Sequence, residues 1–152
     1  MLPRTQMKPI ELEDSLELSS LHKASFYKGW EESDFQGFLQ NPLIHGLKIE
    51  ENHKIIAYLL WQEVETEAEI LTLVVASDHQ RKGMGDHLIE TLFTTLKMKD
   101  ITDIFLEVAE DNEKARCFYI KHGFQFLSKR PHYYSRKGNI HISALNFFRK
   151  IV

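Results

Sequence analysis

The sequence predicts one α/β domain built around a mixed β-sheet, and three observations lead to this fold class. The chain has 152 residues, the usual length of a single domain with a substantial core. Its hydrophobic fraction of 43% and charged fraction of 27% are typical of globular proteins. Apolar patterns with the period of a strand alternate with patterns of helical period, without a repeat or linker, so that residues 1–152 form one unit.

The first half of the chain is expected to supply a strand, two helices and a β-hairpin. The second helix is expected to begin after Ser33, because a serine hydroxyl can accept a backbone N–H at a helix N-terminus. The run from Ile55 to Trp61 is apolar on both faces, as in a central strand. The predicted ranges are 5–10 for the first strand, 13–25 for the first helix, and 43–50 and 54–62 for the hairpin.

The second half is expected to alternate strands and helices. A buried strand at 68–76 is followed by Leu88, Ile89, Leu92, Phe93 and Leu96, whose spacing places them on one face of a helix. A strand at 103–108 and a helix at 113–122 come next. The last two strands are predicted at 124–128 and 140–147, joined by a long polar loop.

Charge and cysteine content narrow the class of protein. The net charge is -3, with 6 basic and 14 acidic residues in 1–78 and 13 basic and 8 acidic residues in 79–152. This balance argues against binding of duplex nucleic acid. The basic half could hold a compact anionic ligand or could simply be a solvated face. Cys117 is the only cysteine, which excludes an internal disulfide, and we expect its thiol to be buried as a small apolar group.

Targeting and metal-binding patterns are not found. The N-terminal residues contain no apolar stretch of signal-peptide length, and the run from Ile55 to Trp61 is much shorter than the roughly 20 residues that cross a bilayer. The 8 histidines show neither HxH nor HExxH spacing, so no metal site is assigned. We therefore expect a cytoplasmic protein that contacts no membrane.

The turn Gln80-Arg81-Lys82-Gly83-Met84-Gly85 lies between a buried strand and an amphipathic helix. The first turn of a helix leaves backbone N–H groups without partners, and these groups attract anions. Gly83 and Gly85 lack a Cβ, so a phosphate can approach the backbone, and Arg81 and Lys82 add positive charge. The turn predicts a phosphate or pyrophosphate ligand, although a plain strand–helix connection fits the same residues.

Further motifs accompany this turn. It lacks the ending of a Walker loop, and Leu88 stands where the dinucleotide fingerprint has its third glycine. It does match Q/R-x-x-G-x-G/A, while residues 112–124 match N-x-x-A-x-x-F/L-Y-x-x-x-G-F. Arg130-Pro131-His132-Tyr133-Tyr134 is similar to an R-x-Y-Y stretch. Over residues 55–147 the chain thus resembles the GCN5-related N-acetyltransferase (GNAT) family, above all the bacterial ribosomal-protein-alanine N-acetyltransferases.

This resemblance implies a GNAT-like α/β domain whose mixed, mostly antiparallel sheet is splayed at strands 4 and 5 and flanked by about four helices. It implies acetyl-CoA as the co-substrate, without a metal. The pantetheine arm would pair with the backbone of Leu73, Val74 and Val75, as an added strand does, and would contact Asn112. The pyrophosphate would bind the amides of the segment made of Arg81, Lys82, Gly83, Met84, Gly85 and Asp86.

The resemblance also implies a catalytic pair. Glu107 matches the general base of the ribosomal-alanine subgroup, and Tyr119 matches its general acid. An α-amine, with an ordinary pKa near 8, must lose a proton before it attacks a thioester. The departing CoA thiolate needs a proton donor, which a phenol provides. Without the resemblance, Glu107 would be interpreted as a strand-end carboxylate and Tyr119 as a core aromatic residue.

The acceptor implied by the subgroup is the N-terminal α-amine of a protein, such as a ribosomal protein. Trp30, Tyr133 and Tyr134 are candidate acceptor-binding residues, and each could instead be a packing aromatic. A small-molecule amine is an alternative acceptor. A CoA-binding regulatory module without turnover is another alternative, and Asp86 and Ala109, which depart from the family pattern, would favour it.

Overall fold

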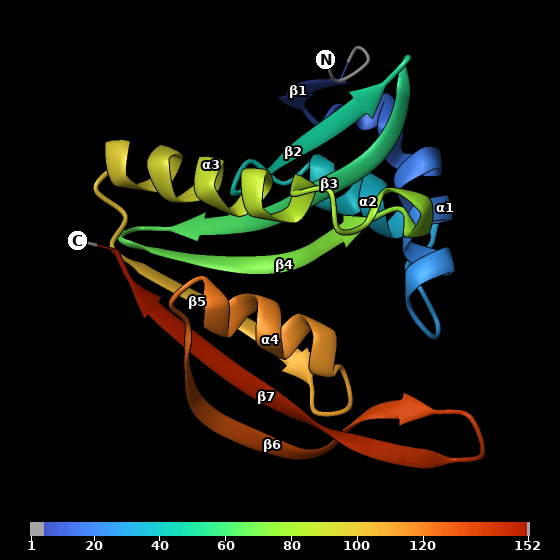
Figure 1. Cartoon of the computed structure of the whole chain (residues 1–152), viewed down its shortest axis with the longest axis vertical. Helices are drawn as coiled ribbons and strands as arrows, with labels where there is room; N and C mark the ends of the chain where they lie inside the picture. Colours follow the sequence, from blue (N-terminus) through green and yellow to red (C-terminus); the bar gives the residue numbers. More distant parts are fainter. Residues whose placement is uncertain (1–4, 152) are drawn as a thin grey trace.

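A seven-stranded mixed sheet forms the centre of the computed structural model, which describes residues 5–151. The strands lie in the order β1-β2-β3-β4-β5-β7-β6, and every neighbouring pair is antiparallel except β4 and β5 (Figure 1). The predicted mixed, mostly antiparallel sheet is therefore confirmed. The strands are β1 (Thr5–Pro9), β2 (Ile44–Glu51), β3 (Lys54–Val64), β4 (Glu67–Val75), β5 (Asp103–Ala109), β6 (Gln125–Arg136) and β7 (Ile140–Lys150).

Helices cover both faces of the sheet (Figure 1). On one face, α1 (Ser15–Ser25) and α2 (Glu32–Leu39) bury Leu18 and Phe35 in a smaller core cluster. On the other face, α3 (Met84–Met98) and α4 (Glu113–Lys121) contribute to the larger cluster, because their apolar residues recur with the period of a helix turn. Two short 3-10 turns, Leu12–Asp14 and Ser77–His79, complete the described chain.

The parallel strands β4 and β5 pair only over their first residues and then diverge. Their register runs from Glu67 opposite Asp103 to Ile70 opposite Leu106, whereas β4 continues to Val75 and β5 to Ala109 (Figure 1). Beyond the last pair, the edge of β4 that faces β5 has no strand partner within residues 5–151. This divergence, called the fork below, is the splay expected at strands 4 and 5.

A β-bulge in β4 lies at the base of the fork. Leu60 of β3 is opposite Thr72, but the next residue, Trp61, is opposite Ile70, so Leu71 is unpaired. Such an extra residue reverses the face to which the following side chains point. Accordingly, Val74 packs in the cluster under α1 and α2, beyond the bulge.

The prediction of a long polar loop between 128 and 140 is wrong, because β6 is a strand as far as Arg136. From Arg130 to Tyr134 the strand advances four residues while its partner β7 advances two, from Ala144 to Ile142. The bulge contains Pro131, which cannot donate a ladder hydrogen bond and is tolerated because β6 is an edge strand. The sequence did not predict this strand because neither of its faces is buried in the core, so its residues show no alternation of apolar and polar side chains.

Two local predictions are also wrong. The N-cap of α2 is Glu31 and not Ser33: the backbone N–H of Glu31 donates to Asp34 at 2.8 Å, and the Glu31 side chain accepts from the N–H of Asp34. Cys117 is exposed and not buried. The inner face of α4 is instead occupied by Tyr119, which is 8% exposed, and Cys117 lies two residues away on the outer face.

Candidate active site

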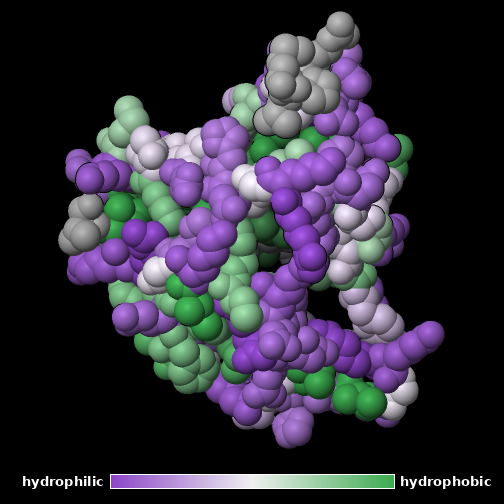
Figure 2. All heavy atoms as spheres, in the orientation of Figure 1, coloured by the Kyte–Doolittle hydropathy of each residue, from purple (hydrophilic) through white to green (hydrophobic). Residues whose placement is uncertain are grey.

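The fork opens a pocket of about 850 Å³ in the middle of the sheet. The α1–α2 connection lines one side of it and the end of β6 lines the other, and Figure 2 shows the surface hollowed between these two segments. Strands β4 and β5 supply residues 70–73 and 106–109 to its inner surface. We call it the fork pocket. The predicted residues that line it are Trp30, Leu73, Glu107, Asn112, Tyr119, Tyr133 and Tyr134.

A second hollow, of about 390 Å³, adjoins the fork pocket below the N-terminus of α3. The two share Leu73, Asn112 and Tyr119, so one extended ligand can occupy both. Lys82, also predicted to bind the cofactor, is exposed and is not among the lining residues. The predicted cofactor residues that line this α3 groove are Leu73, Val74, Val75, Arg81, Gly83, Met84, Gly85, Asp86 and Asn112.

The start of α3 has the features of an anion site. Gly83 has φ of 80°, in the left-handed region that favours glycine, and no side chain of the described residues caps the helix. The amides at the first turn of this 15-residue helix therefore lack helical partners at the positive end of its dipole. A Cβ on Gly85 would lie 3.2 Å from the Phe118 ring. These residues fit a diphosphate because both glycines keep the backbone accessible.

Asp86 does not present an uncompensated negative charge to this groove. Its Oδ1 lies 2.6 Å from Nε2 of His122 and 3.0 Å from Nζ of Lys121. The hydrogen bond with His122, followed by that with Lys121, lowers the pKa of the Asp86 carboxyl below its ordinary value. The carboxylate thus links α3 to the end of α4 and leaves the helix dipole available for an anion.

Glu107 is the first residue of β5 beyond the last β4–β5 pair. Its side chain is 19% exposed, and its Oε2 accepts a hydrogen bond of 3.0 Å from Arg130 of β6. The Arg130 guanidinium lies over the Tyr133 ring, 4.1 Å from the centroid. A carboxylate in this position is oriented by a neighbouring strand and can accept a proton from a group inside the pocket.

Two tyrosines that line the fork pocket remain protonated at neutral pH. Burial raises the pKa of Tyr119, which packs edge-on against Phe118 and Phe124. Burial and, to a smaller extent, the negative charge of Glu107 raise the pKa of Tyr134 to about 12. Each phenol is therefore a proton donor and not a phenolate, and Tyr119 lines both the fork pocket and the α3 groove.

The α1–α2 connection forms a rigid side of the fork pocket, and the sequence did not indicate this. His22 of α1 accepts a hydrogen bond of 3.0 Å from the Trp30 backbone N–H and stacks on the indole at 4.3 Å. Burial lowers the pKa of His22 to about 4, so the ring is neutral near pH 7. Gly29 lies directly on α1, where a Cβ would be 2.6 Å from the Cα of Lys23.

A second feature that sequence reasoning missed joins the opposite side of the pocket to the loop before α4. Arg136 at the end of β6 makes two hydrogen bonds to Asp111, of 2.8 and 2.7 Å. Both residues line the fork pocket. The signal that could have found the pair is the position of Asp111, directly before Asn112, the first residue of the motif at 112–124. Two parallel hydrogen bonds between a guanidinium and a carboxylate fix the relative orientation of the two groups, in addition to the attraction between their charges.

Comparison with known proteins gives the family. The model of the Acetyltransferase (GNAT) family matches residues 15–124. The ribosomal protein bS18-alanine N-acetyltransferase of Escherichia coli strain K12 is 30% identical over 105 residues, which are 69% of this chain and 70% of that protein. The Haemophilus influenzae protein of the same name is 36% identical over 90 residues, 59% of this chain and 61% of its own length.

Solved structures show the same fold. The ribosomal-protein-S18-alanine N-acetyltransferase from Escherichia coli superposes with a TM-score of 0.90 at 24% identity, covering 97% of this chain and 94% of that one. Arabidopsis thaliana NAA60 in complex with a bisubstrate analogue gives 0.83 at 19% identity, covering 97% and 98%. No helix within residues 5–151 is long and apolar enough to cross a membrane. On the family match and these relatives, the chain belongs to the acetyltransferase (GNAT) family.

Proposed function

We propose that this chain transfers the acetyl group of acetyl-CoA to the N-terminal α-amine of a protein, with the N-terminal alanine of ribosomal protein bS18 as the first acceptor to test. One observation carries the proposal: Glu107, Tyr119, Tyr133 and Tyr134 line one pocket, and that pocket adjoins a groove suited to a diphosphate. The printed names of the Escherichia coli and Haemophilus influenzae relatives support this choice of acceptor.

The α3 groove is the proposed site of the co-substrate. The amides of residues 83–86 would hold its pyrophosphate, and the unpaired edge of β4 at 73–75 would bind its pantetheine arm as a strand partner. Asn112, whose side chain accepts a hydrogen bond of 3.1 Å from Ala115 N–H, lies where the groove meets the pocket. Acetyl-CoA supplies a thioester whose carbonyl carbon can be attacked by an amine.

Glu107 and Tyr119 divide the proton transfers of this reaction. Glu107 accepts a proton from the acceptor ammonium, directly or through water, and releases it to solvent. The amine nitrogen then forms its bond to the carbonyl carbon while the carbon–sulfur bond breaks. Tyr119 donates its phenolic proton to the departing sulfur and recovers a proton from the acylated nitrogen. The products are an amide and CoA thiol, with one proton released overall.

The test is acetyl transfer to a panel of peptides with free N-termini, including the bS18 N-terminus, measured by mass. The matched control is the same peptide with a blocked N-terminus, and a panel of metabolite amines is assayed in parallel. We expect transfer to free peptide N-termini only. Turnover with metabolite amines alone would replace the proposed acceptor class, and CoA binding without any turnover would indicate a regulatory module.

The ion pairs of Asp86 weigh against that regulatory module. Its support was the departure from the family pattern at Asp86 and Ala109. Because Lys121 pairs with Asp86 and His122 hydrogen-bonds to it, this carboxylate does not oppose the binding of a diphosphate. Ala109 lines the fork pocket, where a small side chain leaves room for an acceptor.

A further inference from the structure

Thr72 has a buried hydroxyl group that is left without a hydrogen-bond partner by the part of the chain that the structure describes, residues 5–151. The residue is 7% exposed, and its Oγ1 has no hydrogen-bond partner. Within residues 5–151, the only other buried side-chain atom in this state is Nε of Arg116. A buried hydroxyl without a partner destabilises a fold, so that its presence requires a reason.

The position of Thr72 in the fork gives that reason. The last pair of the parallel strands is Ile70 with Leu106; Glu107 is the first residue beyond it on β5, and Thr72 is the second beyond it on β4. Both residues line the fork pocket, and Thr72 is not among those that line the α3 groove. Thr72 therefore lies in the part of the site where the acceptor is proposed to bind.

The side of β4 on which Thr72 lies agrees with this assignment. Beyond the bulge, Thr72 and Val74 point to the same side of the sheet, because side chains alternate along a strand. Val74 packs in the cluster under α1 and α2, the helices whose connection lines the fork pocket. Thr72 thus lies on the side of β4 that faces the rigid α1–α2 connection.

We infer that the Thr72 hydroxyl donates a hydrogen bond to the first carbonyl oxygen of the acceptor peptide; this inference rests on the proposed function. A hydroxyl is a donor that can rotate toward a carbonyl, and every peptide N-terminus has a carbonyl group one carbon away from its amine. A simple alkylamine has none. The bond would therefore help to distinguish protein N-termini from small amines, because a donor left unpaired in the complex weakens binding.

The test compares Thr72→Val, which keeps the shape of the side chain and removes the hydroxyl, with Thr72→Ser, which retains the hydroxyl. In Thr72→Val we expect KM for the peptide to rise about tenfold. We expect KM for acetyl-CoA to stay constant and Tm not to fall, because an unsatisfied hydroxyl has been removed. Thr72→Ser should restore a peptide KM well below that of Thr72→Val.

The matched control is Thr95→Val on α3. The hydroxyl of Thr95 is satisfied by a 2.8 Å hydrogen bond to the carbonyl oxygen of Thr91, so its loss should not raise Tm and should leave the peptide KM unchanged. Equal peptide KM in wild type and Thr72→Val would overturn the inference, and so would a joint loss of Tm and acetyl-CoA affinity. Absence of peptide transfer by the wild type would instead overturn the proposed function, and this inference with it.

Discussion

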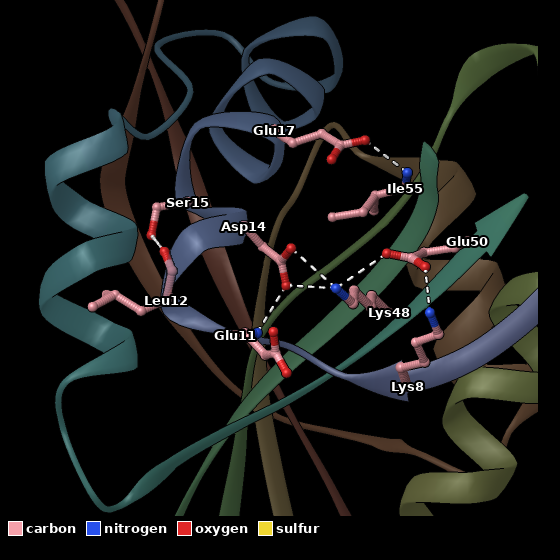
Figure 3. Close-up of polar contacts among 9 residues, drawn as sticks. All are labelled: Lys8, Glu11, Leu12, Asp14, Ser15, Glu17, Lys48, Glu50 and Ile55. Atoms are coloured by element: carbon pink, nitrogen blue, oxygen red, sulfur yellow. Dashed lines mark hydrogen bonds and ion pairs between the residues drawn. The ribbon is translucent and has the colours of Figure 1, made fainter. Parts of the chain in front are cut away.

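Two regions of the molecule that bury polar groups differ in how these groups are paired. In the first region they pair with one another, whereas in the second a hydroxyl has no partner among the described residues. The Lys48 cluster consists of Lys8, Asp14, Lys48 and Glu50, where β2 meets the segment before α1 (Figure 3). Nζ of Lys48 lies 2.8 Å from Asp14 and 3.1 Å from Glu50, and Glu50 lies 2.9 Å from Lys8. In this cluster each charge has an opposite charge beside it.

The fork pocket is arranged differently. Glu107 is paired with Arg130, whose side chain is 54% exposed, and the hydroxyl of Thr72 has no partner among residues 5–151. Burial without full compensation costs stability. The comparison teaches that polar groups paired within the protein maintain its fold, whereas a buried polar group without such a partner at the fork supports the proposal that a ligand binds there. The following predictions test that distinction.

The largest effect is expected at the catalytic pair. Glu107→Gln and Tyr119→Phe should each lower kcat about 10²–10⁴-fold, because the variants cannot accept or donate the proton. CoA affinity, measured by calorimetry, should stay near the wild-type value. The control is Glu110→Gln, which removes a neighbouring carboxylate that pairs with Lys129 at 3.0 Å and should leave kcat unchanged. Unaltered turnover in both catalytic variants would rule out the mechanism.

The reverse behaviour is expected in the Lys48 cluster. Burial alone lowers the pKa of Lys48, but hydrogen bonds with Asp14 and Glu50 outweigh this effect and leave its pKa raised. Lys48→Met should lower the free energy of unfolding by about 3–5 kcal/mol, because it leaves the buried Asp14 carboxylate without its cation and leaves Glu50 with Lys8 alone. Lys8→Met, at a side chain that is 41% exposed, should cost about 1 kcal/mol or less.

The free energy of unfolding of both cluster variants is measured by urea denaturation, and their kcat/KM is measured on the folded fraction. If Lys48→Met changed kcat/KM and left stability intact, the assignment of this cluster to the fold alone would be contradicted.

A smaller effect is expected from a pair of glycines. Gly29→Ala should lower the free energy of unfolding by about 1–3 kcal/mol, because the added Cβ would overlap the α1 backbone. The displaced α1–α2 connection should also raise the peptide KM more than the acetyl-CoA KM. Gly37→Ala in α2, where a Cβ meets nothing within 4 Å, should instead stabilise the protein by up to about 1 kcal/mol. Equal effects of the two substitutions would remove the role given to Gly29.

The smallest effect concerns acid pH. A hydrogen bond from Lys8, ahead of the contribution from Lys48, lowers the pKa of Glu50 below its ordinary value of 4.5. Its stabilising contribution is therefore present above pH 4.5 and is lost as the pH falls through the lower folded-state value. We expect the difference in Tm between wild type and Lys8→Met to shrink as the pH falls below that value. A difference that grew on acidification would have the wrong sign.

The sequence was sufficient for most of the fold, because burial of one helix face or of whole strands leaves a periodic pattern. It failed at β6, whose polar residues around Pro131 form an edge strand and leave no such pattern. It also failed at Cys117, since a small apolar residue fits either side of a short helix.

The candidate site divides in the same way. Gly83 and Gly85 could be recognised because glycine at a helix start has a local backbone reason. The pairing of Arg130 with Glu107 and the unsatisfied state of Thr72 could not be recognised, because each depends on which residues the fork brings together across more than one strand.

The edge strand β6 has a consequence for how this protein could change over evolutionary time. Tyr133, Tyr134 and Arg136 line the fork pocket but not the α3 groove. Because β6 pairs with β7 alone in the described part of the chain, replacement of its exposed side chains leaves the pairing of the other strands in place. Under the proposed function, descendants of this chain would acquire new acceptors through changes in β6 while they keep the same acetyl donor.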